Sequence, residues 1–214
     1  ERPAVCTTYR VYKVCGMGPP SSGATTVFGI LGMIEGWDMK TMGQANPMSW
    51  HLLSEAMQLS YADRDKYLGD GDFVAVPVAG LIDKTYLAER RQLISPYGRA
   101  ASYPAGNPPG AQPRTTSGPV AEQGTTHFVV VDRAGSGASM TSTIESIFGS
   151  NLIANGYFLN NEMTDFDLNP EKGGAPAANR VQAGKRPLSS MSPAIVYGPG
   201  GKVVLAGGSV GVAV

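Results

Sequence analysis

The chain has 214 residues, in which 17 lysines and arginines balance 17 aspartates and glutamates, giving a formal net charge of zero. Because it has no dense basic run, nucleic acid and anionic membranes are poor candidates for partners. No apolar run approaches the ~20 residues of a membrane helix, and no signal peptide opens the chain. Both ends fall abruptly at strand-like segments, so we expect an internal piece of a longer protein.

The two cysteines, Cys6 and Cys15, flank an alternating segment typical of a strand or a tight hairpin. The thiols can pair across such a hairpin or remain reduced. If they pair, the protein belongs in an oxidising compartment such as a periplasm. No metal site is expected, because the two histidines, His51 and His127, are distant in sequence.

The pattern predicts a buried helix over residues 24–35, with Ser21 or Ser22 as the N-cap and Gly36 as the stop. Asn46 and Pro47 open a second helix that runs to about residue 67. A third, shorter helix is expected over residues 84–93.

We expect one face of the second helix to carry large apolar side chains, those of Trp50, Leu53, Met57 and Tyr61. The aspartates around its end (Asp63, Asp65, Asp70 and Asp72) do not follow the register of a calcium loop, and a solvated helix end explains them better.

Residues 105–124 read as an extended, poorly packed linker, since residues 105–120 hold four prolines and three glycines. A strand over residues 125–132 follows at once. Both of its faces are mostly apolar, which predicts burial on both sides. His127, within it, is interpreted as a hydrogen-bonded core histidine rather than a catalyst.

Thr125 stands at the boundary between this linker and this strand. Cleavage of the Gly124–Thr125 bond would give Thr125 a free amine beside its own hydroxyl, which is a base and a nucleophile on one residue. The alternative on these residues alone is an ordinary loop entering a strand that begins with threonine.

Further short strands are expected over residues 139–143, 193–197 and 203–206, with a hairpin turn over residues 198–202. Helices first and strands later favour an α+β fold in which a helical layer packs on a sheet. A G-x-S-x-G pattern around Ser209 matches a serine-hydrolase elbow, but no histidine follows it, so a glycine-rich turn is the preferred interpretation.

Four strings, taken together, go beyond single patterns: Pro19-Pro20-Ser21-Ser22-Gly23, Thr125-Thr126-His127, Asn160-Asn161-Glu162-Met163-Thr164-Asp165-Phe166 and Lys185-Arg186-Pro187-Leu188-Ser189-Ser190-Met191-Ser192-Pro193. In this order and spacing they resemble the γ-glutamyltranspeptidase family of N-terminal nucleophile hydrolases. The resemblance covers nearly the whole chain.

The resemblance implies a four-layer αββα sandwich, present here in part, and a proenzyme that cuts itself into two subunits. Residues 1–124 would be the end of the large subunit and residues 125–214 the beginning of the small one. The family's carboxylate-binding arginine and the end of the small subunit fall outside the chain, so we expect the chain by itself to be inactive.

By this resemblance Thr125 is the nucleophile in both self-cleavage and turnover, and Gly124 precedes the scissile bond. Thr143 aligns with the threonine that hydrogen-bonds the nucleophile. Val210 and Gly211 align with two glycines whose amides form the oxyanion hole, and a valine there departs from the family pattern.

The resemblance also implies which residues bind the substrate. Glu162 and Asp165, three apart, can clamp an ammonium group, while Ser189 and Ser190 can donate to a carboxylate. Without the resemblance, an acidic turn and loop capping explain these residues. Glu145 stands where transpeptidases often carry asparagine. A carboxylate at this position is expected either to strengthen the binding of the substrate ammonium or to shift the preference toward another acyl group.

The expected function is γ-glutamyl transfer to an amino acid, peptide or water, on glutathione-like substrates and without cofactor or metal. The two subunits of one precursor would be partners, in a periplasmic or secreted protein. The alternatives are a cephalosporin or glutaryl acylase of the same fold and an uncleaved, non-catalytic binding protein.

Overall fold

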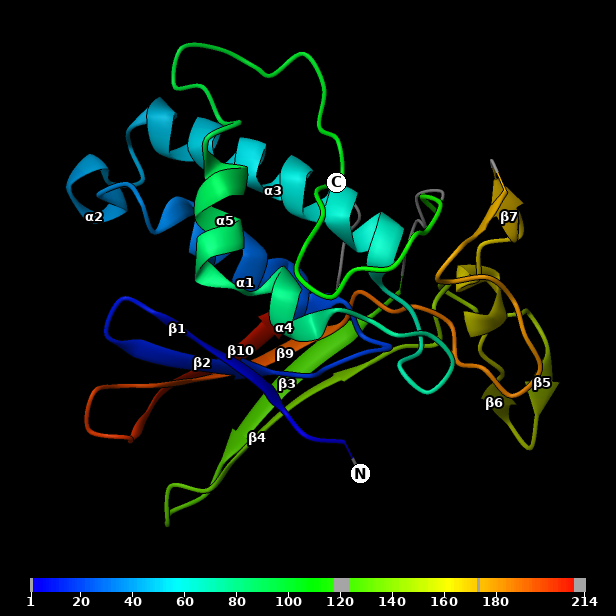
Figure 1. Ribbon diagram of the computed structural model, residues 1–214. Coiled ribbons are helices and arrows are strands. Elements are labelled where there is room, and N and C mark those ends of the chain that lie inside the picture. The colour runs from blue at the N-terminus through cyan, green and yellow to red at the C-terminus, as the bar shows by residue number, and fades with distance from the viewer. Residues whose placement is uncertain (1, 118–123, 173, 210–214) are drawn as a thin grey trace.

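The computed structural model describes residues 2–117, 124–172 and 174–209. A layer of helices lies on one side of a sheet, and a two-stranded hairpin lies on the other side (Figure 1). The helices are α1 (Gly23–Ile34), α2 (Met39–Met42), α3 (Pro47–Tyr67), α4 (Val78–Leu81) and α5 (Lys84–Arg91). In the described part of the chain, no helix is both long enough and apolar enough to cross a membrane.

The starts of the two long helices fall where the sequence predicts them. Asn46 caps α3, since its side-chain oxygen accepts from the Met48 amide at 3.0 Å, and Pro47 is the first helical residue. Ser22 precedes α1, but its side chain makes no capping bond to that helix. Ser22 is thus the N-cap residue by position, as predicted, while its hydroxyl donates to the Ser189 carbonyl in the loop before β9.

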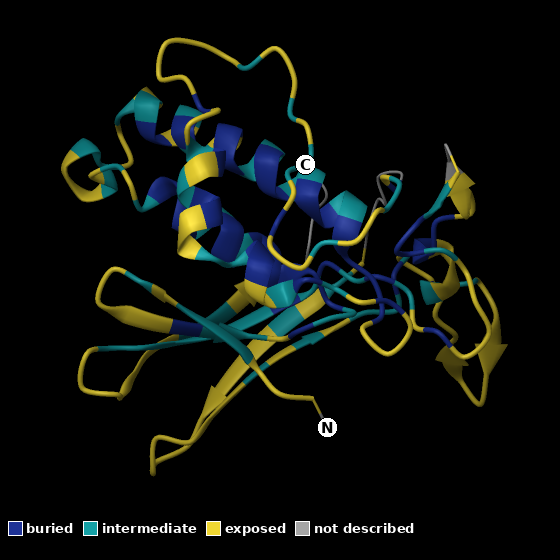
Figure 2. Cartoon of the chain, in the orientation of Figure 1, coloured by how far each residue is buried: buried dark blue, intermediate teal, exposed yellow. Residues whose placement is uncertain are grey.

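The side of α3 that enters the core lies next to the predicted stripe of large apolar side chains, of which Leu53 packs against the core. Leu52, Ala56 and Leu59 enter the core between α1 and α5, whereas Trp50 is 59% exposed. Figure 2 shows the same contrast between the buried faces of α1 and α3 and their exposed surfaces. Two neighbouring stripes of this helix are apolar, and α1 and α5 pack against the stripe that contains Leu52 rather than the one that contains Trp50.

The main sheet has the strand order β1-β2-β9-β10, all antiparallel neighbours. Its strands are β1 (Val5–Tyr9), β2 (Tyr12–Gly16), β9 (Ser192–Tyr197) and β10 (Val203–Ser209). Phe28 and Ala24 of α1 pack on Val14 of β2. Cys6 and Cys15 lie opposite each other in β1 and β2 and form a disulfide. Of the two alternatives left open by the sequence, paired or reduced thiols, the structure has the pair.

The second sheet is the hairpin of β3 (Thr126–Val131) and β4 (Gly137–Ser142), which lies against β9 and β10. The prediction that β3 is buried on both sides is wrong in this structure, because Val130 and Val131 are 58% and 62% exposed. One face of the hairpin meets the main sheet, and in the described part of the chain no further layer covers the other. Three layers of the αββα sandwich are thus present.

Four short strands form two small hairpins beside the sandwich: β5 (Ile153–Ala154) with β6 (Tyr157–Phe158), and β7 (Glu171–Lys172) with β8 (Ala175–Pro176). Between the two hairpins lies a single 3-10 turn, η1 (Glu162–Asp165).

The described part of the predicted linker has no helix or strand, yet it is not poorly packed as predicted. Pro108 is fully buried, and the Gly106 amide donates to the buried carboxylate of Asp63 at 2.6 Å. The Tyr67 hydroxyl donates to the Gly106 carbonyl at 2.7 Å. These contacts fasten the segment to the end of α3.

Candidate active site

Thr125 and Thr143 lie opposite each other at the open end of the β3–β4 hairpin. The register pairs Thr126 with Ser142, so the residues just outside the ladder are brought together. The Thr125 Oγ1 donates to the Thr143 Oγ1 at 2.9 Å. Thr143 Oγ1 also accepts from the Glu145 amide at 2.8 Å, which fixes its hydroxyl relative to the turn that follows β4.

Gly124 precedes Thr125 in a conformation that favours glycine, with φ +85°. A Cβ at this position would lie 2.9 Å from the Glu145 carbonyl oxygen and 3.1 Å from the Ser146 carbonyl carbon. The backbone before Thr125 therefore passes close to the 145–146 peptide, and only glycine fits without displacement of that turn.

Glu145 is 5% exposed and has φ +72°, an uncommon conformation for a side-chain-bearing residue. Its carboxylate accepts from the Ser146 hydroxyl at 2.7 Å and from the Asn161 side-chain amide. Asn161 in turn accepts from the Ser146 amide at 2.9 Å. The residue whose backbone amide binds Thr143 thus also carries a buried carboxylate that is held by neutral donors.

Glu162 and Asp165 begin and end the 3-10 turn η1. Residues three apart eclipse each other in a 3-10 helix. Glu162 and Asp165 therefore lie on one side of the η1 turn, as predicted. Asp165 is buried and Glu162 half-buried. The Asp165 backbone carbonyl accepts from the Asn179 side-chain amide at 2.6 Å, while the Asn179 side-chain oxygen, Oδ1, accepts from the Leu188 amide at 2.9 Å.

Ser189 and Ser190 follow Leu188, in the loop that enters β9. The Ser22 amide donates to the Ser189 carbonyl at 2.7 Å, and the guanidinium of Arg64 donates to the Ser190 Oγ at 2.6 Å. Ser190 is 6% exposed. The loop is fixed against the start of α1 and the end of α3. The Ser189 Oγ also accepts from the Met191 amide at 3.2 Å, so loop capping describes Ser189, whereas Ser190 is bound by a residue outside the loop.

The structure joins most of the predicted residues in one hydrogen-bonded path. It leads from Thr125 and Thr143 through Glu145 to Asn161 and η1, and from η1 through Asn179 to the serine loop. Asn161 and Asn179 are the connecting residues that sequence reasoning missed. Asn161 stands within a quoted string, whereas nothing local marks Asn179.

Val210 and Gly211, the predicted oxyanion residues, lie outside the described residues. The Gly207–Ser209 stretch before them continues β10 rather than forming the expected turn. The hairpin turn over residues 198–202 is confirmed by the Gly198 amide, which donates to the Lys202 carbonyl at 2.9 Å.

His127 is hydrogen-bonded as predicted, with its Nδ1 2.8 Å from the Thr141 Oγ1. It is half-buried between β3 and β10, close enough to Gly208 that a Cβ there would lie 2.5 Å from its ring. These contacts give the histidine a packing role.

The interpretation of the aspartates near the end of α3 as a solvated helix end is wrong for two of them, Asp63 and Asp70. Asp63 is buried beside Arg90, 3.2 Å away, and burial raises the pKa of its carboxyl despite that charge. Asp70 has no exposed side-chain surface and accepts from Arg186 Nε at 3.0 Å and Nη2 at 2.7 Å.

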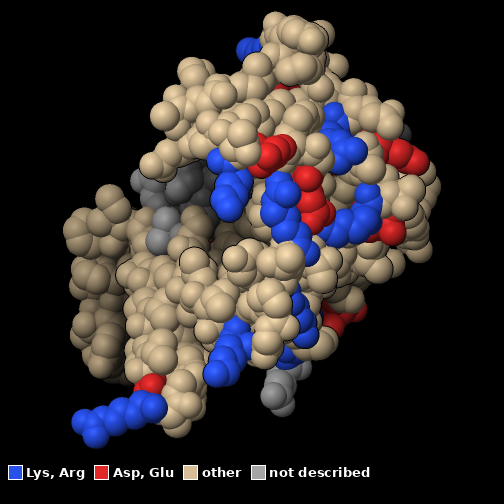
Figure 3. Space-filling view, turned by 90° about the vertical axis from the view of Figure 1, so that its left-hand side faces the viewer, with Lys and Arg blue, Asp and Glu red and all other residues tan. Residues whose placement is uncertain are grey.

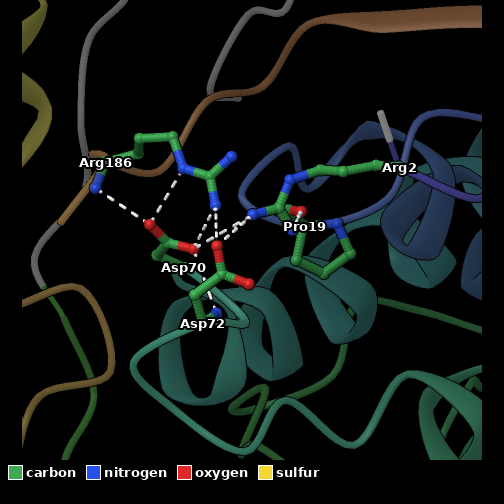
Figure 4. A network of polar contacts seen from close by, with 5 residues as sticks. All are labelled: Arg2, Pro19, Asp70, Asp72 and Arg186. Atoms are coloured by element: carbon green, nitrogen blue, oxygen red, sulfur yellow. Dashed lines mark hydrogen bonds and ion pairs between the residues drawn. The ribbon is translucent and has the colours of Figure 1, made fainter.

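Figure 4 shows that Arg186 and Arg2 converge on Asp70 and Asp72 from opposite sides. Long-range ion pairs therefore explain this acidic group. No group of three or more potential metal ligands occurs among the described residues. On the face seen in Figure 3, basic and acidic side chains are interspersed.

Comparison with solved structures defines the class of fold. A crystal structure of cephalosporin acylase from Bacillus halodurans superposes with a TM-score of 0.78 at 21% identity, covering 95% of this chain and 33% of that one. The likeness concerns the fold, a sandwich of helices and sheets.

Comparison of sequences defines the family. The Gamma-glutamyltranspeptidase family model matches residues 1–213. A glutathione hydrolase proenzyme of Pseudomonas sp. (strain A14) is 40% identical over 209 residues, which are 93% of this chain and 34% of that protein. Acylase ACY 1 proenzyme of Pseudomonas sp. (strain SE83) is 37% identical over 188 residues, covering 87% and 31%.

The chain belongs to the γ-glutamyltranspeptidase family. It spans about a third of the length of the curated relatives that it matches.

Proposed function

We propose that the protein containing this chain is a self-processing γ-glutamyl transferase and hydrolase with Thr125 as its nucleophile. The 2.9 Å hydrogen bond between Thr125 and Thr143, directly after a glycine at φ +85°, is the observation that carries the proposal. It holds a threonine hydroxyl beside a peptide bond whose preceding residue has no side chain to obstruct attack.

In maturation the Thr125 hydroxyl adds to the Gly124 carbonyl, the C–N bond breaks with protonation of the nitrogen, and an ester remains. Water then hydrolyses the ester and releases Thr125 with a free α-amine. This amine has an ordinary pKa of about 7.7–8.0, so near neutral pH a useful fraction accepts the hydroxyl proton.

In turnover the same hydroxyl attacks the γ-amide of a glutamyl donor. The amine or amino-acid part leaves with a proton, and the acyl group remains on Thr125 as an ester. Water or an amino-group acceptor then takes the acyl group. We assign the oxyanion donors to the backbone amides of Val210 and Gly211, as the family resemblance implies.

The donor's head group is an α-amino acid, and the polar residues around Thr125 suit both of its charges. We assign the substrate ammonium to the carboxylates of Glu145, which is bound by Asn161, and of Glu162 and Asp165 in the η1 turn that follows Asn161. Ser189 and Ser190 supply hydroxyls for the α-carboxylate. No cofactor or metal enters these steps.

An acylase is the second candidate, because a relative that carries an acylase name is 37% identical. A glutaryl group has no α-amine, so it gains nothing from three carboxylates. We therefore expect a γ-glutamyl anilide to be cleaved with kcat/KM at least tenfold above that of the glutaryl anilide. The reverse order would assign the protein to the acylases.

The boundary between subunits falls at Gly124–Thr125 in this proposal, so residues 1–124 belong to the large subunit and residues 125–214 to the small one. The disulfide between Cys6 and Cys15 supports a periplasmic or secreted location. Fractionation of cells that produce the full-length protein tests the location.

The test of the function is the intact mass and N-terminal sequence of the purified full-length protein, beside a Thr125→Ala variant. A new N-terminus at Thr125 in the wild type alone supports self-cleavage. A wild-type protein that stays whole through long incubation would refute the enzyme proposal and favour a non-catalytic binding protein.

A further inference from the structure

Arg64 is a buried arginine at the end of α3 that reaches the serine loop. Its side chain is 2% exposed. The guanidinium donates from Nε to the Ser22 Oγ at 3.0 Å, from Nη2 to the Ser190 Oγ at 2.6 Å and from Nη1 to the Asp65 carboxylate at 2.9 Å. A planar guanidinium whose nitrogens all have partners fixes the relative positions of those partners.

Ser22 extends this hold to the neighbouring serine. While its Oγ accepts from Arg64, it donates to the Ser189 carbonyl at 3.0 Å, and the Ser22 amide donates to the same oxygen at 2.7 Å. On the other side, the Ser189 amide donates to the Pro20 carbonyl at 3.2 Å. The Pro20–Ser22 segment thus clamps Ser189, and Arg64 clamps Ser190.

The chemistry of these groups determines the direction of the hydrogen bond between Arg64 and Ser190. A guanidinium only donates hydrogen bonds, so Ser190 must act as an acceptor toward Arg64. Its hydroxyl hydrogen is then directed away from Arg64, as a donor. A carboxylate only accepts, so a hydroxyl held in this sense matches it, and the nearby positive charge strengthens the match.

We infer that Arg64 is the positioning residue for the α-carboxylate of the acyl donor, acting through Ser22 and Ser190 without contact to substrate. The inference rests on the proposed γ-glutamyl function. It also gives a role to the Pro19–Gly23 string, which the catalytic steps do not use.

The test uses the full-length, processed enzyme and two donors: a γ-glutamyl anilide, and the 4-aminobutanoyl anilide that lacks only the α-carboxylate. For Arg64→Gln we expect KM for the glutamyl donor to rise about tenfold to a hundredfold, with kcat changed less than threefold. For the 4-aminobutanoyl donor we expect less than a threefold change. Arg64→Lys, which keeps the charge without the fork, recovers part of the loss.

The matched control is Arg90→Gln. Arg90 is also buried and paired, to Asp63 at 3.2 Å, but its contacts lie away from the serine loop. We expect this variant to melt at a lower temperature while the ratio of the two KM values stays that of the wild type. Should Arg64→Gln fail to fold, Ser22→Ala removes one arm of the clamp and is expected to shift the same ratio about threefold to tenfold.

Equal losses for the two donors in Arg64→Gln, or an unchanged ratio in Ser22→Ala, would overturn the inference and leave Arg64 a structural residue. A wild-type enzyme that cleaves neither donor would instead refute the proposed function itself. The two failures are therefore distinguishable.

Discussion

The Thr125 hydroxyl lies 2.9 Å from that of Thr143, and the Glu145 amide approaches Thr143 from the other side at 2.8 Å. Thr143 is thus fixed by the backbone of the turn after β4 and in turn fixes Thr125. The relationship follows from the β3–β4 register, which places the two residues opposite each other. A nucleophile held at the end of a ladder has its rotamer set before any substrate binds.

Replacement of Thr143 by valine keeps the shape and removes the hydroxyl. We expect self-cleavage and turnover to slow about tenfold to a hundredfold, since Thr125 loses its partner and the Glu145 amide is left without its acceptor. Thr143→Ser is expected to retain most activity. The rates are read from intact mass over time and from anilide hydrolysis.

The control for this prediction is Thr141→Val, which makes the same change two residues earlier, where the hydroxyl bonds His127. Equal slowing by both valine variants would mean that the strand, and not the Thr125 contact, is what matters.

Gly124→Ala is expected to slow self-cleavage strongly. Alanine at φ +85° costs roughly 1–2 kcal/mol, and its Cβ would crowd the 145–146 peptide. Gly135→Ala is the matched comparison, because Gly135 has φ +86° with open space around it. Comparison of the half-times of self-cleavage of the two variants separates backbone strain from crowding. A Gly124→Ala variant that cleaves at the wild-type rate would contradict the close approach of Gly124 to the 145–146 peptide.

Asp70 precedes and Arg186 follows the proposed cleavage site in the sequence, and the two side chains form an ion pair at 2.7 Å. Arg186→Met leaves a fully buried carboxylate with fewer donors. We expect a loss of about 1–3 kcal/mol in the free energy of unfolding, since the half-exposed arginine is partly screened by solvent.

Arg180→Met serves as the control for this pair, because Arg180 faces an exposed Glu171 at 3.9 Å. We expect its melting temperature to stay within a degree or two of the wild type, a change of less than about 0.5 kcal/mol. Equal losses in both variants would remove the special role of Asp70.

The Cys6–Cys15 disulfide closes a short hairpin with a sequence separation of 9. For a loop of this length, chain entropy predicts a stabilisation of roughly 2–3 kcal/mol. Reductant should therefore lower the melting temperature of the wild type and leave a Cys6→Ser, Cys15→Ser double variant unchanged. A wild type insensitive to reductant would show that the bond contributes little to stability.

Local signals in the sequence were sufficient for much of the fold. Asn46 and Pro47 mark the start of α3 because capping depends on adjacent residues. The glycine-rich turn over residues 198–202 likewise marks the β9–β10 hairpin. The buried face of α3 was not predictable in this way, because Leu52 and Trp50 lie on neighbouring apolar stripes and only packing distinguishes them.

Long-range partners account for the other differences. Asp63 and Asp70 are acidic residues at a helix end by sequence, but Arg90 and Arg186 make them buried ion pairs. In the site, Thr125 and Thr143 could be predicted from family motifs. Arg64 and Asn179 could not, because they act through contacts with loops far away in the sequence.

The most direct test of the account is to trap the acyl group. The processed full-length enzyme is mixed with a γ-glutamyl anilide, quenched in acid, digested and analysed by mass spectrometry. We predict one glutamyl group in ester linkage on the peptide that begins at Thr125, and about tenfold to a hundredfold less of that adduct in the Thr143→Val enzyme quenched equally early. A glutamyl adduct on any other residue, or turnover with no adduct on Thr125 at any quench time, would contradict the assignment of the nucleophile.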